Sequence, residues 1–207
     1  MNIVVFGAGG RAGRHAVAEA RRRGHQVTAV VRDPAGHGDL NDVRVVAGDV
    51  TDAGSVEYAA TGHDAAISAA VDLSVPARDF FTASSRALTT GLAKAGVRRL
   101  VVVGLASIMP GASGGPLMDE PGYPNEYRPF SLGHAAGLAE LRTSDLDWVY
   151  VAPAGDFDHD GTPTGRYRLA EHGDPASRMT YADFAIALLD ETEAPRHHSA
   201  AVSVREA

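Results

Sequence analysis

The chain has 207 residues, of which 44% are hydrophobic and 22% charged, and this composition argues against a disordered or fibrous protein. Its net charge of −7 and its scattered basic residues make nucleic acid a poor partner, and the lack of cysteine excludes disulfides and thiolate chemistry. No apolar run reaches the roughly 18 residues of a membrane span, and no signal-peptide layout precedes the first strand, so we expect a cytoplasmic protein without membrane contact.

The first elements along the chain predict a βαβ unit. Asn2–Phe6 is a β-branched and aromatic run typical of a strand, and a glycine-rich turn follows it. Alanines then recur at helical spacing up to Gly24, which ends the helix. Gln26–Val31 is apolar on both faces, as expected for a strand of a parallel sheet that is covered on both sides.

The same alternation continues and predicts a doubly wound, mostly parallel α/β sheet of the Rossmann type in a single domain. The further strands are expected at residues 43–47, 65–69, 99–103, 147–151 and 201–204. The further helices are expected at residues 52–60, 78–95, 131–143 and 181–191. Two irregular stretches, about residues 104–130 and 153–180, are expected to form the substrate side, because long loops in a compact domain are usually functional.

The glycine-rich turn is the strongest motif of the chain. Gly7, Gly10 and Gly13 stand three residues apart between a strand and a helix, a spacing that lets the backbone approach a pyrophosphate closely. The start of the helix supplies an anion site. Turns also collect glycine for conformational reasons alone, but the flanking βαβ pattern favours dinucleotide binding. The residues expected to contact the dinucleotide here are Gly7, Gly9, Gly10, Arg11, Ala12 and Gly13.

The residue that closes the second strand predicts which dinucleotide binds. In such folds this position meets the adenosine ribose, where an acid selects NAD and an arginine accommodates the 2′-phosphate of NADP. Arg32 occupies it, so we expect NADPH, with NADH less favoured. The alternative is that Arg32 only pairs with Asp33 on a solvated loop.

Asp49 and Val50 follow the third predicted strand, and we place both in the nucleotide site. The Asp49 carboxylate could accept a hydrogen bond from the adenine amino group, or it could cap the next helix. Because Thr51 and Asp52 can cap that helix themselves, we expect Asp49 to be free for the nucleotide.

Together these residues resemble the atypical short-chain dehydrogenase/reductases, in particular the NADH-flavin reductase group related to biliverdin and flavin reductases. The resemblance runs nearly from end to end and is carried by residues 7–14, 30–34, 48–52, 147–154, 164–168 and 181–185. It implies a Rossmann-type fold and an NAD(P)H cofactor whose nicotinamide lies near Ala69, Ala70 and Pro153. It also implies a small acceptor above the nicotinamide.

The chain departs from the wider superfamily at its acid–base residues. Many members place a tyrosine and a lysine four residues apart on one helix, where the ammonium lowers the pKa of the phenol. In the nearest register, Phe130 stands at the tyrosine position and His134 at the lysine position. The missing acid favours flavins, quinones or enones as acceptors, because their conjugated systems stabilise charge and water can deliver the proton.

Three residues are candidates for chemistry beyond the cofactor. Ser107 follows the fifth strand at the carboxyl edge of the sheet, where ligands bind, although it could equally be a turn serine. His134 could donate a proton near neutral pH, and the alternative is a surface or ribose-contacting histidine. Tyr127 could cover the nicotinamide or supply a phenol proton, although most loop tyrosines only pack.

We expect no metal, because residues 157–160 lack an ordered ligand set and the adjacent His197 and His198 point opposite ways in extended backbone. The leading hypothesis is an NADPH-dependent reductase, monomeric or homodimeric, that delivers a hydride to a small conjugated acceptor. A flavin would then be a substrate rather than a bound cofactor. Two hypotheses stay open beside it: a redox sensor that binds NADP(H) without turnover, and an isomerase, cyclase or dehydratase on the same fold.

Overall fold

An eight-stranded sheet lies at the centre of the computed structural model, which describes residues 1–40 and 42–207. Its order is β3-β2-β1-β4-β5-β6-β10-β8, and all neighbours are parallel except β10 and β8, which are antiparallel. The chain order reverses between β1 and β4, the point at which open α/β sheets bind ligands. The strands are β1 (Asn2–Phe6), β2 (Gln26–Val31), β3 (Arg44–Ala47), β4 (Ala65–Ser68), β5 (Arg99–Val103), β6 (Asp147–Pro153), β8 (Tyr167–Ala170) and β10 (Ala200–Glu206).

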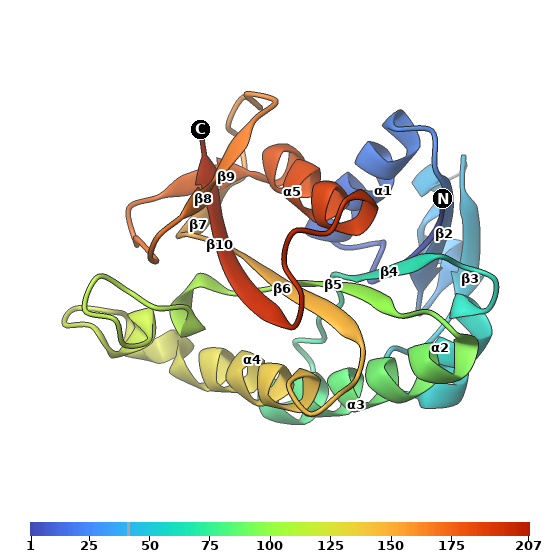
Figure 1. The fold of residues 1–207 in the computed structure, drawn as a ribbon, viewed down its shortest axis with the longest axis horizontal. Helices are drawn as coiled ribbons and strands as arrows, with labels where there is room; N and C mark the ends of the chain where they lie inside the picture. Colours follow the sequence, from blue (N-terminus) through green and yellow to red (C-terminus); the bar gives the residue numbers. More distant parts are fainter. Residues whose placement is uncertain (41) are drawn as a thin grey trace.

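Helices cover both faces of this sheet, as Figure 1 shows. One face carries α1 (Arg11–Arg22) and α5 (Tyr181–Glu193), which pack against each other. The other face carries α2 (Ala53–Ala60), α3 (Ala77–Ala95) and α4 (Arg128–Leu141). The doubly wound Rossmann-type architecture predicted from the sequence is therefore confirmed. Within the described ranges, no helix is long and apolar enough to cross a membrane.

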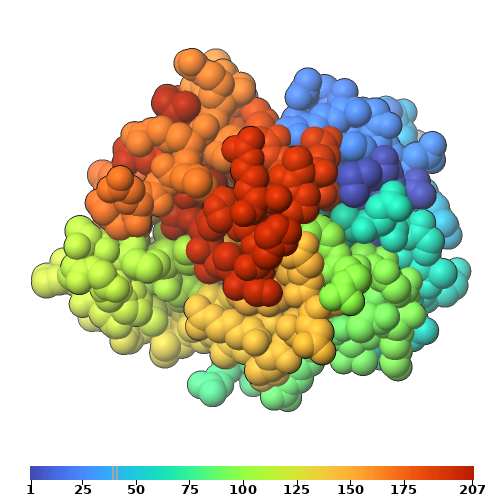
Figure 2. Space-filling model, viewed as in Figure 1, coloured from blue at the N-terminus to red at the C-terminus, as the bar shows by residue number. Residues whose placement is uncertain are grey.

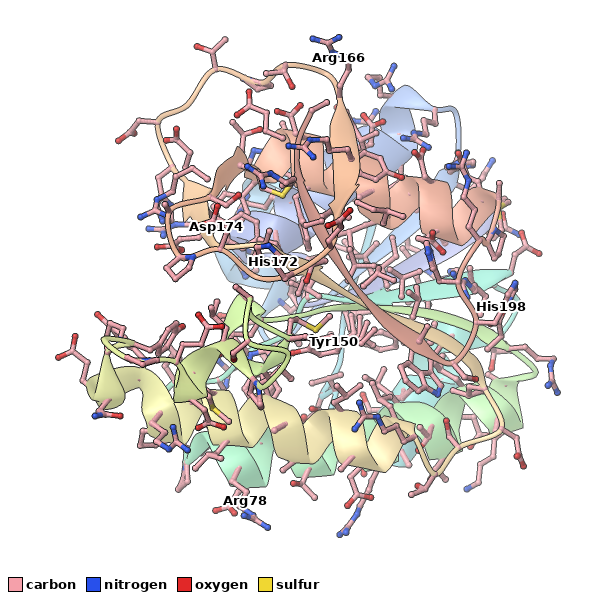
Figure 3. All side chains as sticks on the ribbon, turned by 60° about the vertical axis from the view of Figure 1, so that its left-hand side comes forward. Arg78, Tyr150, Arg166, His172, Asp174 and His198 are labelled. Atoms are coloured by element: carbon pink, nitrogen blue, oxygen red, sulfur yellow. The ribbon has the colours of Figure 1, made fainter. Side chains whose placement is uncertain are left out.

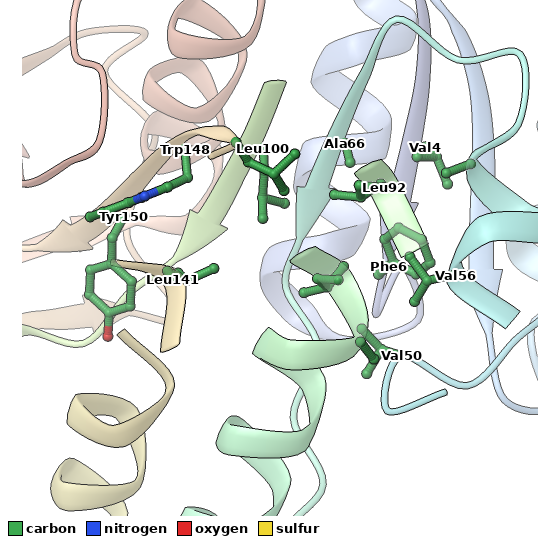
Figure 4. Close-up of a cluster of buried hydrophobic side chains, with 14 of the residues drawn as sticks. Val4, Phe6, Val50, Val56, Ala66, Leu92, Leu100, Leu141, Trp148 and Tyr150 are labelled. Atoms are coloured by element: carbon green, nitrogen blue, oxygen red, sulfur yellow. The ribbon is translucent and has the colours of Figure 1, made fainter. Parts of the chain in front are cut away.

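Each helical layer encloses its own hydrophobic core. The core between the sheet and α2, α3 and α4 includes Leu92, Leu100 and Trp148 (Figure 4). The core beneath α1 and α5 includes Ile67 and Phe184. A central strand such as β4 is buried along its whole length, which explains why its sequence, Ala-Ala-Ile-Ser, does not alternate between apolar and polar residues.

The predicted elements agree closely with the observed ones where apolar runs and glycines mark them. The bounds of β1, β2 and β5 are as predicted, and α3 ends at Ala95, just before Gly96, whose φ of +76° is the left-handed conformation that suits a helix end. The start predicted for α4 is wrong by three residues: the helix begins at Arg128 because Pro129 is tolerated in a first helical turn. The sequence reading also missed β7 (Asp156–Asp158), β8 and β9 (Arg178–Thr180).

The two segments expected on the substrate side lie next to each other. The segment after β5 contains the short 3-10 helices η3 (Ala106–Ile108), η4 (Leu117–Asp119) and η5 (Asn125–Tyr127). In Figure 2 it lies directly beneath the segment that follows β6, which holds the β7–β9 pair. The backbone N–H of Gly173 donates to the carbonyl of Pro110 at 2.7 Å and joins the two segments.

Candidate functional site

A cavity of about 510 Å³ lies at the carboxyl ends of β1, β2, β3 and β4. Its lining comes from the glycine-rich turn after β1, the end of β2 with His37 beyond it, residues 48–51 after β3, and the segment after β4 together with the start of α3. Eight of the residues expected to bind the cofactor are among its lining residues, namely Gly7, Gly9, Gly10, Arg32, Asp49, Val50, Ala69 and Ala70. The cavity therefore coincides with the edge of the sheet at which the chain order reverses.

Two glycines of the turn are required by the packing of the protein itself. Gly7 has a φ of +73°, and a Cβ there would stand 2.5 Å from the Cα of Ala70. A Cβ on Gly13 would stand 2.2 Å from the carbonyl oxygen of Gly7, because α1 packs directly on the turn. Gly13 therefore brings α1 close to β1 and does not itself line the cavity.

Gly10 differs from these two glycines, because the protein leaves room for a side chain there. A Cβ on Gly10 would meet its nearest neighbour, the carbonyl oxygen of Gly7, at 3.4 Å, which is ordinary contact. Gly10 precedes α1 with extended backbone, and neither a side-chain cap nor an acidic residue in the first turn occupies the helix start. The backbone N–H groups of Gly7, Ala8 and Gly10 donate to carbonyls within the protein, so the amides suited to a phosphate group are those at the uncapped start of α1.

Three residues expected to contact the cofactor, Arg11, Ala12 and Pro153, are not part of the cavity lining. Arg11 is the first residue of α1, and its guanidinium donates to Nδ1 of His159 at 3.1 Å. The ring of His159 in turn lies 5.5 Å from that of Tyr181 at the start of α5. Pro153 is the last residue of β6 and is buried. Arg11 thus ties the segment after β6 to the glycine-rich turn.

Arg32 projects from the end of β2, and its partner is not the one considered from the sequence. Its guanidinium forms an ion pair with Asp72, which follows β4. Asp33 instead accepts a hydrogen bond from the backbone N–H of Ala35 at 3.0 Å. The alternative in which Arg32 pairs with Asp33 is therefore wrong. Asp72 is a cavity residue that the sequence reading missed.

Asp49 lines the cavity but is not wholly free of the protein. One of its carboxylate oxygens accepts from the backbone N–H of Thr51 at 2.8 Å and from the Thr51 hydroxyl at 2.7 Å. The cap of α2 is Asp52, which accepts from the N–H of Ser55. The expectation that Asp52 caps the helix is confirmed. Thr51 does not cap the helix but donates both of its hydrogen bonds to the Asp49 carboxylate.

His37 is a second cavity residue that the sequence reading missed. Its ring lies over Gly9, where a Cβ would stand 2.3 Å from Cε1 of the imidazole. Arg14 donates to the Gly9 carbonyl at 2.8 Å and to Nδ1 of His37 at 3.1 Å. Since a guanidinium can only donate, Nδ1 of His37 acts as the acceptor, which leaves Nε2 as the donor of a neutral ring. No local sequence signal marks His37, because only the fold brings it to the turn.

Ser107 and Tyr127, two candidates for chemistry, lie outside the lining of this cavity. Ser107 is 1% exposed, and its hydroxyl donates to that of Ser131 at 2.7 Å. Ser131 in turn donates to the backbone carbonyl of Tyr127 at 3.2 Å, at the start of α4. The Tyr127 side chain is exposed. The Ser107 hydroxyl thus fixes η3 to α4 and points into the protein.

The third candidate, His134, lies inside the helical layer beneath the sheet. A hydrogen bond of 2.8 Å joins its Nδ1 to the hydroxyl of Tyr150, which also accepts from the backbone N–H of Leu105 at 3.0 Å. Tyr150 descends from β6 toward α4 in Figure 3. The ring of Phe81 lies 3.8 Å from that of His134. Burial lowers the pKa of His134 to about 3, so its ring is neutral, and it is a poor proton donor near pH 7.

Fold and cavity together define a dinucleotide-binding α/β protein, with backbone amides at a helix start for the diphosphate and an arginine at the end of the second strand. Comparison with known families agrees: the NAD(P)H-binding family matches residues 7–192. The chain belongs to this family.

Three relatives match nearly the whole chain. The uncharacterized protein YwnB of Bacillus subtilis (strain 168) is 35% identical over 208 residues, which cover 95% of this chain and 94% of YwnB. A crystal structure of a "putative exported protein" from Burkholderia pseudomallei is 36% identical, with a TM-score of 0.85 and 99% of each chain covered. A "putative NADH-flavin reductase" from Streptococcus pneumoniae TIGR4 is 33% identical, with a TM-score of 0.85 and 100% of each chain covered. The resemblance predicted from the sequence is confirmed.

Proposed function

We propose that this protein is an NADPH-dependent reductase that transfers a hydride to a small conjugated acceptor of the flavin, quinone or enone type. The observation that carries the proposal is the glycine-rich turn. Gly10 leaves room for a diphosphate next to the uncapped start of α1, and Arg32 lines the same cavity. When bound, NADPH supplies the hydride from C4 of its nicotinamide. Such a reductase needs a pool of reduced cofactor, which favours the cytoplasm.

The residues of the chain have distinct roles in this proposal. The turn from Gly7 to Gly13 holds the diphosphate, and Arg32 contacts the 2′-phosphate. Asp49 and Val50 border the adenine, while Ala69, Ala70 and Pro153 border the nicotinamide. Because His134 and Ser107 are engaged inside the protein, we assign proton delivery to water at the acceptor. The name of the pneumococcal relative supports a flavin among the acceptors to be tested.

The first experiment measures cofactor binding by titration calorimetry. We expect Arg32→Asp to weaken NADPH binding about tenfold or more and to leave NADH binding equal or tighter, since a charge-assisted contact contributes about 1.5–3 kcal/mol. Arg21→Asp is the matched control: it changes the net charge equally, but Arg21 pairs with Asp42 away from the cavity. If the wild-type protein bound neither NADPH nor NADH, the proposal would fail. Unchanged NADPH affinity in Arg32→Asp would remove Arg32 from the site.

A second candidate function is a sensor that binds NADP(H) without turnover. The observation that favours it is the engagement of Ser107 and His134 in internal hydrogen bonds, together with phenylalanine at position 130. The two functions separate in an assay that follows the near-ultraviolet absorbance of NADPH with flavins, quinones and enones. Oxidation that depends on the acceptor supports the reductase. Tight binding with no oxidation across the panel supports the sensor.

A further inference from the structure

The ion pair between Arg32 and Asp72 crosses the cavity above the glycine-rich turn. Arg32 follows β2 and Asp72 follows β4, and β1 lies between these two strands in the sheet. Both residues line the cavity together with Gly7 and Gly10. The pair therefore joins the two sides of the site at the point where the chain order reverses.

The two partners of this pair differ in how firmly they are held. One carboxylate oxygen of Asp72 accepts from the backbone N–H of Ser74 at 2.9 Å and from the Ser74 hydroxyl at 2.6 Å. These hydrogen bonds lower the pKa of Asp72 and keep it ionised. The side chain of Asp72 is 16% exposed, whereas that of Arg32 is 69% exposed. The carboxylate is thus fixed, and the guanidinium is the partner that can turn away.

The charges that line the cavity make Arg32 the decisive cation. Among the described lining residues, Arg32 is the one lysine or arginine, whereas Asp49, Asp72 and Asp79 contribute carboxylates. A 2′-phosphate carries up to two negative charges and binds an arginine through charge-assisted hydrogen bonds, which a neighbouring carboxylate weakens when it occupies donors of the same guanidinium. An ordinary ribose hydroxyl has no such requirement.

We propose that Asp72 is a specificity-determining residue: it competes with the 2′-phosphate of NADPH for Arg32 and thereby reduces the preference of the site for NADPH over NADH. This inference rests on the proposed function, because it assumes that the adenosine end of the dinucleotide occupies this cavity. It extends that function by describing a site in which the selecting arginine is restrained by a fixed carboxylate. Removal of the carboxylate charge frees Arg32 for the phosphate.

The test uses adenosine 2′,5′-bisphosphate and adenosine 5′-diphosphate as probes, titrated calorimetrically at low salt. In Asp72→Asn we expect the bisphosphate to bind about fivefold tighter and the diphosphate to stay within about twofold, which matches the upper range of an exposed ion pair. Asparagine keeps an oxygen for the Ser74 bonds, so the loop is retained. Asp79→Asn is the matched control, since it removes one carboxylate from the same cavity, and we expect the ratio of the two affinities to stay unchanged.

A double-mutant cycle completes the test. In an Arg32→Ala background, Asp72→Asn should no longer change the ratio of the two affinities, because the guanidinium for which Asp72 and the 2′-phosphate compete is absent. Weaker bisphosphate binding in Asp72→Asn would overturn the inference by making Asp72 a support for Arg32. Equal shifts for both probes would overturn it as well. If the wild-type protein bound neither NADPH nor NADH, the proposed function itself would fail, whereas binding with an unchanged ratio in Asp72→Asn would defeat this inference alone.

Discussion

The carboxyl edge of the sheet has two halves that use their polar groups in opposite ways. Over β1 to β4, the uncapped start of α1 at Gly10 and the guanidinium of Arg32 border a cavity. Over β5 and β6, the Ser107 hydroxyl donates to the Ser131 hydroxyl, and the His134 ring and the Tyr150 hydroxyl bond to each other inside the protein. The difference teaches that a group suited to chemistry stays available where it borders open space, as the Arg32 side chain does at 69% exposed although it pairs with Asp72.

The largest effect that can sharpen this comparison is a loss of stability in the first half. We expect Gly13→Ala to lower the free energy of unfolding by about 3 kcal/mol, because its Cβ would stand 2.2 Å from the Gly7 carbonyl oxygen and α1 would have to move. Urea denaturation measures this change. Gly10→Ala is the control and should unfold within about 0.5 kcal/mol of the wild type. Equal stability of Gly13→Ala and Gly10→Ala would contradict the distinction between the two glycines.

The next effect concerns the buried histidine of the second half. The pKa of His134 is about 3 in the folded protein, below its ordinary 6.5, so the unfolded chain binds a proton that the folded chain does not. Stability contributed by the neutral ring is therefore present above pH 6.5 and is lost as the pH falls toward 3. Between pH 7 and pH 5 this loss amounts to about 2 kcal/mol.

The measurement for His134 compares the pH dependence of unfolding rather than its absolute free energy. In His134→Asn the decline between pH 7 and pH 5 should be smaller than in the wild type by about 2 kcal/mol. Asparagine keeps a polar atom near the Tyr150 hydroxyl, although the smaller side chain lowers stability at every pH. Parallel declines in the two proteins would mean that His134 titrates normally and is accessible to water.

The smallest predicted effect is on NADPH binding at Gly10 in the cavity. We expect Gly10→Ala to weaken NADPH binding about tenfold, because a methyl group fits the protein but enters the space that a diphosphate needs. Titration calorimetry measures the affinity, and the unfolding experiment above shows that the fold is intact. Unchanged NADPH affinity in a stable Gly10→Ala protein would place the diphosphate elsewhere.

The strands and helices that could be predicted from the sequence are those marked by a pattern within a short stretch of residues. The central strands are buried on both faces, so Gln26–Val31 and Arg99–Val103 are mostly apolar after a polar first residue, and their ends are clear. The strands β7, β8 and β9 have three or four residues each and mixed composition. They form through pairing with distant segments, and no short window of sequence contains that information.

The same limit explains which site residues could be predicted. Gly10 and Arg32 follow from motif spacing, because a βαβ unit brings the ends of its first two strands together. Asp72 lies 40 residues beyond Arg32 and His37 lies in a segment without a motif, so only the fold shows that both enter the cavity. An acid followed two residues later by serine at the end of a strand is the local signal that could have drawn attention to Asp72.

The antiparallel strand β8 has a consequence for the behaviour of the chain at high concentration. It closes one edge of the sheet with only four residues, and the Arg168 side chain is exposed there. A short outermost strand that carries a cation presents few unpaired amide groups to a strand from another molecule. This edge of the protein therefore resists the intermolecular strand addition that leads to aggregation.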